Sequence, residues 1–248
     1  MSINAILQPI KSFFDYLSFN LQYELMLLSF RSKNRKEVFN DIYYRNRWGD
    51  RDSISGRGSN LQQTSIIIKE IPVLLENLNV KRMLDAPCGD FYWLKEAELN
   101  LDRYIGCDIV AELVTKNQRL YGNESREFIN LDLAADALPQ VDLIFCRDCL
   151  VHLSFKDALA VIKNFKKSNS KYLLTTTYPG ILENKDIVTG DWRAIDLKLP
   201  PYNFPDMLEI IDEKTTERKD YPQKSLGLWK LSDIGNKEWG TNKNGGFI

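Results

Sequence analysis

The sequence predicts an α/β domain: an open, mostly parallel sheet of seven strands with helices on both faces, preceded by an N-terminal helical extension. Three observations support this fold class. Short apolar strands that end at acidic residues follow one another along the chain, helical patterns separate them, and a tight glycine turn follows the first strand. The 248 residues, 44% hydrophobic and 27% charged, suffice for one such domain plus an extension. We therefore assign residues 1–60 to the extension and its lid loop, and residues 61–248 to the main domain.

The extension opens with a predicted helix over Phe13–Phe30. Its apolar residues recur at spacings of three and four, while polar residues interrupt the run, so we expect no bilayer crossing. The helix could pack on the domain, form a homodimer contact with a second copy, or lie on a membrane surface. The apolar stripe comprises Phe14, Leu17, Leu21, Leu25 and Leu28.

A second helical pattern, Glu37–Trp48, leads into a loop over Gly49–Asn60. Three glycines and three serines give this loop a backbone that can wrap a ligand. We interpret it as a lid, with the alternative that it is a surface linker. Residues 31–57 hold eight Lys or Arg against four acidic residues, a local surplus that favours a small anionic substrate. The side chains expected at the ligand are Tyr44, Trp48, Ser55, Arg57 and Ser59.

The first strand follows a predicted helix over Ser65–Leu78 and ends at Asp85. The chain then turns through Pro87 and Gly89 into an expected helix. Gly89 lets a ligand approach the backbone, since it has no side chain, and a helix beginning there would aim its free N–H groups at the same place.

The remaining strands are expected in order, with connecting helices at Ala111–Tyr121 and Phe155–Lys167. Because the carboxyl ends of parallel strands share one edge of the sheet, their terminal acids should gather there. Asp108, nineteen residues after Gly89, is placed to accept hydrogen bonds from both hydroxyls of a ribose. The strands are Arg103–Asp108, Glu127–Asp132, Val141–Arg147 leading into Asp148, Lys171–Tyr178, Met207–Ile211 and Leu226–Leu231.

Charge and cysteine usage exclude several classes of protein. A formal net charge of −1 and a pI near 6.0 argue against a dedicated nucleic-acid binder. The four cysteines fall in or beside predicted strands, where cysteine behaves as a small apolar residue, so we expect a cytoplasmic protein. Cys146 and Cys149 form a CxxC pair, but without a second pair and with one histidine in the chain, we predict no metal and no redox site. The start of the chain does not resemble a signal peptide.

At this point the sequence carries a resemblance. The segments LDAPCGDFYWL, GCD, NLDL and DLIFCRD, in this order, resemble the class I S-adenosylmethionine-dependent methyltransferases, which have a Rossmann-like fold, over roughly residues 65–231. The segments SGRGSN, DCLVHLS, TTTYPG and GDWRAIDLKLPPYNFP resemble a bacterial group within them that is associated with surface polysaccharides, capsule or lipopolysaccharide. The chain departs from the usual glycine loop at Pro87 and Phe91, which implies an altered path around the methionine tail.

The resemblance implies S-adenosylmethionine as the cofactor. Asp108 would bind the ribose diol, Asp132 the adenine amine, and aromatic rings would surround the sulfonium. Asp85 and Asp90 flank the loop, so they would receive the methionine ammonium or, alternatively, fix the loop itself; a strand-end acid such as Asp85 can tie down neighbouring backbone amides. The cofactor-binding residues expected are Trp48, Asp85, Ala86, Pro87, Gly89, Asp90, Trp93, Asp108, Ile109, Asp132, Leu133 and Arg147.

Asp148 and His152 are the candidate catalytic residues. Four apart, they could share a helical face, so that the acid orients the imidazole as general base; alternatively the histidine is only a satisfied hydrogen-bonding group, with Asp148 the next candidate base. Arg193 offers a forked donor for phosphate or carboxylate, or an internal ion pair with Asp186 or Asp196. With the lid residues above, the expected substrate-binding residues are Tyr44, Ser55, Arg57, Ser59, Tyr178, Trp192 and Arg193.

The function expected from the resemblance is O-methylation of a small anionic acceptor. A nucleotide-activated or phosphorylated sugar for capsule or lipopolysaccharide, such as a heptose, is the first expectation. Another small acceptor, a phosphoramidate or a lipid-linked product, is an alternative. So is a methyltransferase-like binding subunit that does not catalyse.

Overall fold

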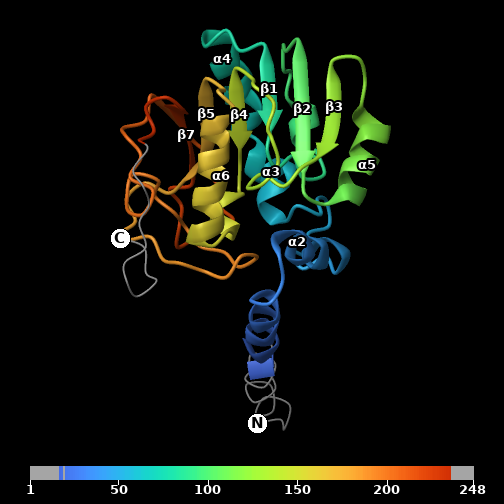
Figure 1. Cartoon of the computed structure of the whole chain (residues 1–248), viewed down its shortest axis with the longest axis vertical. Coiled ribbons are helices and arrows are strands. Elements are labelled where there is room, and N and C mark those ends of the chain that lie inside the picture. The colour runs from blue at the N-terminus through green and yellow to red at the C-terminus, as the bar shows by residue number, and fades with distance from the viewer. Residues whose placement is uncertain (1–16, 19, 236–248) are drawn as a thin grey trace, which may run out of the picture.

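The chain forms a seven-stranded sheet in the order β3-β2-β1-β4-β5-β7-β6. The structure is a computed structural model that describes residues 17, 18 and 20–235. The first five strands pair in parallel, and β7 runs antiparallel to both β5 and β6. Figure 1 shows helices in front of and behind this sheet. The predicted fold class, including the N-terminal helical part, is therefore confirmed.

The strand limits agree with the predicted ones to within two residues. The strands are β1 Arg82–Asp85, β2 Arg103–Asp108, β3 Arg126–Asn130, β4 Leu143–Cys146, β5 Tyr172–Thr177, β6 Glu209–Asp212 and β7 Ser225–Lys230. The helices α5 Ala111–Tyr121 and α6 Phe155–Lys167 have the predicted limits, while α4, Ile67–Asn77, begins two residues later than expected and contains Pro72. Shorter helical segments are α3 Leu61–Thr64 and the 3₁₀ turns η1 Arg57–Ser59, η2 Leu94–Glu96 and η3 Leu150–His152.

The core lies on both faces of the sheet, because successive side chains of a strand point to opposite sides. Along β1, Met83 joins the cluster that contains the apolar face of α4, whereas Leu84 joins the cluster around α6. In β4, Phe145 and Cys146 divide in the same way. Burial on both faces explains why these strands are short, continuous apolar runs.

The helix expected directly after Gly89 does not form. Gly89 and Phe91 both adopt left-handed backbone conformations, with φ of 53° and 56°, so a right-handed helix cannot start here. The loop is held instead by Cys88 N–H, which donates to the Cys107 carbonyl, and by the Asn117 amide, which donates to the Gly89 carbonyl. The predicted helix N-terminus at Gly89, with its free N–H groups aimed at a ligand, is therefore absent at this turn.

The N-terminal helix projects from the body of the molecule (Figure 1). Residues 20–30 are helical, and the described part of the predicted stripe is exposed: Leu17, Leu21, Leu25 and Leu28 are 46, 62, 56 and 53% exposed. Phe14 and the start of the expected helix lie outside the described residues. The base of the helix is fixed to the body by buried Phe30 and by the Tyr23 hydroxyl, which donates to the Asp191 carboxylate. Among the described residues, the helices are too short or too polar to cross a membrane.

The second helix, α2, covers Arg35–Tyr44 and ends four residues before the predicted limit at Trp48. Asn34 caps it: its side-chain oxygen accepts from the Glu37 backbone N–H, and its own backbone N–H donates to the Glu37 carboxylate. Figure 1 shows α2 beneath the ends of the strands toward which the arrowheads of β1 and β2 point. This placement brings the extension against the edge where the predicted site residues lie.

Candidate active site

A cavity of about 290 Å³ lies at the carboxyl ends of the parallel strands. One wall comes from the strand tips and the loops that follow them, including Asp85, Gly89 and Asp108. The opposite wall comes from Trp48 and from the loop at residues 54–59. The cavity thus lies between the sheet edge and the N-terminal extension, where ligands of open α/β sheets bind.

The predicted lid loop is attached to the glycine loop through Asp90. The Asp90 carboxylate accepts hydrogen bonds from the Ser53 hydroxyl at 3.0 Å, the Ile54 amide at 3.0 Å and the Ser55 hydroxyl at 3.2 Å. A Cβ atom at Gly89 would lie 2.2 Å from Ser55 Oγ, so only glycine allows this close approach. Of the two roles expected for Asp90, cofactor binding and fixing the loop, its carboxylate has the second, although it also lines the cavity. The Ser55 hydroxyl predicted for the substrate likewise bonds to Asp90.

The glycine-loop end of the cavity carries buried carboxylates without cations. Asp108 is 8% exposed and accepts from the Val110 amide at 3.0 Å, and burial raises its pKa to about 6. Burial also raises the pKa of Asp85, to about 8, even though the Tyr104 hydroxyl donates to it at 2.5 Å. Within the described chain, neither carboxylate forms an ion pair. Cys88, Leu113 and Pro87 line the same end.

Asp132 reaches the cavity, but its carboxylate is already paired. Arg35 Nη2 lies 2.8 Å from Asp132 Oδ2, and Arg35 Nη1 lies 2.7 Å from Asp157 Oδ1. Arg35 therefore ties α2 to the loop after β3 and to α6 at this end. The predicted role of Asp132 as acceptor for an adenine amine stays a prediction, although both of its carboxylate oxygens already accept from Arg35. This end of the cavity also offers apolar surface to a planar ring, from Ile109, Leu131 and Leu133.

His152 lines the cavity, but contrary to the prediction its hydrogen-bond partner is not Asp148. Its Nδ1 atom lies 2.8 Å from the Asp191 carbonyl oxygen, and its ring lies 5.0 Å from the Trp48 ring between centroids. The predicted shared helical face is absent because Asp148 has a left-handed φ of 52° and η3 is a single 3₁₀ turn. Burial lowers the pKa of His152, which favours a neutral imidazole.

Asp148 belongs instead to a network of five charged groups, of which Arg147, Glu213 and Lys224 are buried and Asp148 and Glu217 are partly buried. Lys224 Nζ lies 2.6 Å from its Oδ2 atom, and Arg147 Nη1 lies 3.2 Å from the same atom. Burial alone would raise the pKa of Asp148, but these two cations hold it below its usual range. Glu213 accepts from Arg147 at 2.6 Å and lies 3.7 Å from Lys224, and Glu217 lies 3.9 Å from Lys224.

Arg147 lines the cavity, yet its guanidinium serves the protein rather than a free ligand. It pairs with Glu213, and its Nη2 atom donates to the Gly58 carbonyl at 2.8 Å, which holds the second half of the lid. The guanidinium also lies 5.4 Å from the ring centroid of Trp93. The predicted cofactor contact through Arg147 is therefore replaced by a lid contact.

Aromatic rings form the wall near the chain segment after β5. Trp192 packs edge-on against Tyr178 and Tyr221, with ring centroids 6.0 and 5.4 Å apart. The guanidinium of Arg218 lies 3.6 Å from the Trp192 ring centroid and covers one face of it. Trp192 and Tyr178 thus lie at the cavity as predicted, but the face of Trp192 expected to receive a sugar or base is covered by a cation.

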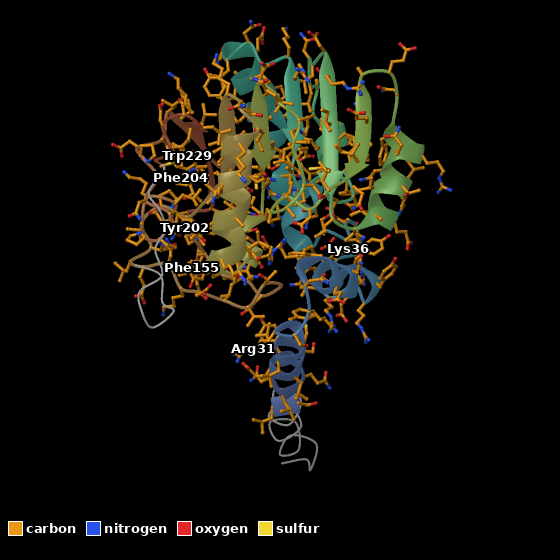
Figure 2. The ribbon with its side chains drawn as sticks, viewed as in Figure 1. Arg31, Lys36, Phe155, Tyr202, Phe204 and Trp229 are labelled. Carbon is orange, nitrogen blue, oxygen red and sulfur yellow. The ribbon has the colours of Figure 1, made fainter. Side chains whose placement is uncertain are left out.

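Three predicted residues lie outside the cavity lining. Ala86 is fully buried in the core, and Tyr44 is 64% exposed, whereas its neighbour Tyr43 lines the cavity. Arg193 is buried: it donates to the Leu153 carbonyl and at 2.7 Å to the Tyr202 hydroxyl, and it pairs with neither Asp186 nor Asp196. It therefore cannot bind a substrate anion. Figure 2 shows Tyr202 beside Phe155, whose ring Arg193 covers at 5.0 Å.

The basic surplus of residues 31–57 is largely used within the protein. Lys33, Arg45 and Arg47 all pair with Asp41, and Arg35 pairs with Asp132 and Asp157. Arg31 and Lys36, labelled in Figure 2, are not part of the cavity lining. Of the eight cations, only Arg35 and Arg57 line the cavity. The surplus itself is therefore weaker evidence for an anionic substrate than the sequence suggested.

Most predicted site residues nevertheless meet at one cavity. The predicted residues in its lining are Trp48, Ser55, Arg57, Ser59, Asp85, Pro87, Gly89, Asp90, Trp93, Asp108, Ile109, Asp132, Leu133, Arg147, Asp148, His152, Tyr178 and Trp192. Those that the sequence did not single out include Arg35, Phe39, Tyr43, Phe145, Glu217, Arg218 and Lys224. All four cysteines are buried free thiols, as expected of small apolar residues. Within the described residues, no group of three His, Cys, Asp or Glu side chains is arranged to hold a metal ion.

Comparison with known proteins identifies the fold class. Neither the models of protein families nor the curated protein sequences match the chain. Among solved structures, human N-acetylserotonin methyltransferase in complex with S-adenosylmethionine has a TM-score of 0.56 at 15% identity, over 80% of this chain and 60% of that one. Magnesium protoporphyrin IX methyltransferase from Synechocystis, with the same molecule bound, has a TM-score of 0.50 at 17% identity, over 80% of this chain and 98% of that one. The N-methyltransferase NodS of Bradyrhizobium japonicum, in complex with S-adenosylhomocysteine, has a TM-score of 0.51 at 13% identity, over 76% of this chain and 97% of that one.

The structural neighbours are thus class I methyltransferases, and the chain has their fold. This confirms the resemblance at the level of fold. Two of these neighbours are named for different substrates, magnesium protoporphyrin IX and N-acetylserotonin, so the neighbours give no common acceptor.

Proposed function

We propose that the protein is an S-adenosylmethionine-dependent O-methyltransferase. The single observation that carries this proposal is one cavity in which Gly89, Asp108 and His152 meet at the strand ends of a class I methyltransferase fold. The neighbours with S-adenosylmethionine or S-adenosylhomocysteine bound support the same choice of cofactor.

The residues at the glycine-loop end fit that cofactor. Burying Asp85 and Asp108 without counter-ions is unfavourable unless a ligand brings positive charge or hydrogen-bond donors. S-adenosylmethionine carries both. Its sulfonium and ammonium supply positive charge, and its ammonium and ribose diol supply hydrogen-bond donors. Asp108 would accept from the diol, Asp85 would face the ammonium, and Ile109, Leu131 and Leu133 would contact the adenine ring.

The catalytic proposal rests on the neutral form of the His152 imidazole, which can accept a proton. Bound in the cavity, S-adenosylmethionine supplies an activated methyl group that an acceptor oxygen takes up. The acceptor hydroxyl must lose its proton, and a neutral His152 with Nδ1 hydrogen-bonded to a carbonyl has Nε2 free to accept it. Asp148 is a poorer base because the cations of Lys224 and Arg147 lower its pKa, so its carboxylate has little affinity for a proton. The lid and Trp48 line the cavity and would keep water from the reacting groups once the ligands are bound.

For the acceptor, we propose a small anionic molecule, in the first place a nucleotide-activated or phosphorylated sugar of the kind built into capsule or lipopolysaccharide. Sequence segments support the sugar class, and Arg57 at the cavity supports the negative charge. We also propose that the exposed leucines of the N-terminal helix contact a second copy of the chain.

Two measurements test the function in turn. Calorimetric titration with S-adenosylmethionine and S-adenosylhomocysteine should show binding to both; no binding would favour a methyltransferase-like subunit that does not catalyse. Incubation with methyl-labelled S-adenosylmethionine and a panel of nucleotide sugars and sugar phosphates should then transfer label to one of them. Label found only on lipid-linked or phosphoramidate compounds would move the acceptor to that class.

A further inference from the structure

The cavity carries different charges at its inner end and at its mouth. The inner end is formed by the network around Asp148, which holds two cations and three carboxylates and so has a formal charge of −1. Its members are Arg147, Lys224, Asp148, Glu213 and Glu217.

Neither cation of the inner end is available to a ligand anion. Lys224 is 2% exposed and has three carboxylates within 4 Å, and Arg147 has two. A phosphate or carboxylate placed there would meet a net negative charge in a buried setting, where repulsion is strong. The inner end therefore suits an uncharged group such as a hydroxyl.

Arg218 differs from these cations in both position and partners. It is exposed, lines the same cavity, and has no carboxylate within ion-pair distance among residues 17, 18 and 20–235. Its guanidinium lies against Trp192, which Tyr178 and Tyr221 fix from the side. A guanidinium stacked on a ring keeps its in-plane N–H groups free for the two oxygens of an anion.

A second guanidinium, that of Arg57, belongs to the same mouth. It is exposed, lines the cavity and has no ion-pair partner in the described chain. The adjacent residues, Gly58 and Glu217, are in contact: a Cβ atom at Gly58 would lie 2.7 Å from Glu217 Oε2. The lid segment that carries Arg57 therefore lies next to the segment that carries Arg218, and Gly58 is held by its hydrogen bond from Arg147.

We infer that Arg218 and Arg57 form the anion-binding end of the acceptor site, and that the acceptor enters with its uncharged reacting hydroxyl inward. Two guanidiniums at a solvent-facing mouth fit a phosphate or diphosphate, whose charge stays outside the network around Asp148. Arg218 is then a specificity-determining residue. This inference rests on the proposed function, since it orients an acceptor relative to His152.

The test uses inorganic pyrophosphate as the probe and calorimetry on the full chain, first with S-adenosylhomocysteine alone and then with pyrophosphate in its presence. The variants are R57Q and R218Q, with K219Q as matched control, because Lys219 is an exposed neighbour outside the cavity lining. Each arginine variant should bind pyrophosphate roughly tenfold to a hundredfold more weakly, the effect of losing a charge-assisted hydrogen bond. K219Q should match the wild type, and all four proteins should bind S-adenosylhomocysteine alike.

The outcomes separate the inference from the proposed function. If S-adenosylhomocysteine binds but pyrophosphate does not, or if R218Q binds pyrophosphate as tightly as K219Q, the anion site is wrong and the methyltransferase proposal stands. If S-adenosylhomocysteine does not bind to the wild type, the proposed function falls and the acceptor orientation falls with it. Unchanged S-adenosylhomocysteine affinity in R57Q and R218Q shows that those variants are folded.

Discussion

His152 Nδ1 lies 2.8 Å from the carbonyl oxygen of Asp191. A carbonyl oxygen only accepts hydrogen bonds, so the ring proton of the neutral imidazole resides on Nδ1 and the lone pair on Nε2. Burial lowers the pKa of His152 and so favours this neutral form. A backbone carbonyl thus takes the orienting role that a carboxylate has in many acid–base pairs.

The first prediction concerns this imidazole. His152→Gln should lower kcat by roughly 10²–10⁴-fold, the usual contribution of a general base, because glutamine cannot accept the acceptor proton. In the wild type, kcat should rise with pH as His152 loses its proton, with a midpoint below 6.5, and remain level above it. Steady-state kinetics with the acceptor found in the panel would check both effects. Full turnover by H152Q at unchanged S-adenosylhomocysteine affinity would exclude His152 as the base.

The sequence predicted the residues whose positions follow from a strand end. Asp85 and Asp108 are the last residues of β1 and β2, and parallel pairing places both at one edge whatever the loops do. Predictions that needed loop geometry were less successful. The expected pairing of Asp148 with His152 assumed a helix, but the left-handed φ of Asp148 turns the chain another way.

Residues far along the chain could not be found from the sequence. Glu217 and Arg218 lie in a charged stretch between β6 and β7 that reads as an exposed loop, and only the return of β7 beside β5 brings Lys224 to the cavity. Tyr43 was missed for a smaller reason: neighbouring residues of a helix point in different directions, and the sequence alone did not show that Tyr43, rather than Tyr44, faces the cavity.

The second prediction concerns Asp108. Asp108→Ala should weaken S-adenosylmethionine binding by about 1.5–3 kcal/mol, because the ribose hydroxyls lose a charged acceptor. Calorimetric titration measures this directly. Asp102→Ala, a change at an exposed acid just before β2, is the control and should leave the affinity as it is. Equal affinities in the two variants would remove Asp108 from the ribose site.

The third prediction concerns stability and Asp85. Its pKa of about 8 in the folded chain exceeds the ordinary value of 3.8, so the folded state holds the proton more tightly than the unfolded state. The stabilisation this provides is complete below pH 4 and is lost as the pH rises toward 8, by up to about 1.4 kcal/mol per pH unit.

An isosteric amide cannot titrate, so Asp85→Asn should lack this dependence. The free energy of unfolding of the wild type, relative to D85N, should fall between pH 5 and pH 8. Urea unfolding of both proteins without ligand, at several pH values in that range, provides the comparison. The titration of Asp108 is present in both proteins and cancels in the difference. Parallel pH profiles would mean that Asp85 is not protonated in the folded chain.

The fourth prediction concerns the lid. Asp90 accepts hydrogen bonds from Ser53, Ile54 and Ser55, so Asp90→Ala removes every one of these contacts between the lid and the glycine loop. The Ile54 amide should then exchange its hydrogen roughly tenfold faster or more, since hydrogen bonds to a charged group contribute about 1.5–3 kcal/mol each. S-adenosylhomocysteine should also dissociate faster, because the wall opposite Gly89 is then held by fewer hydrogen bonds. Hydrogen exchange resolved by mass spectrometry over residues 50–59, with Asp102→Ala as control, measures the first effect, and stopped-flow displacement measures the second. Exchange at Ile54 that stays at the rate of the control would show that the remaining bonds are enough to hold the lid closed: the backbone N–H of residue 90 to the Ser55 hydroxyl, and Arg147 to the Gly58 carbonyl.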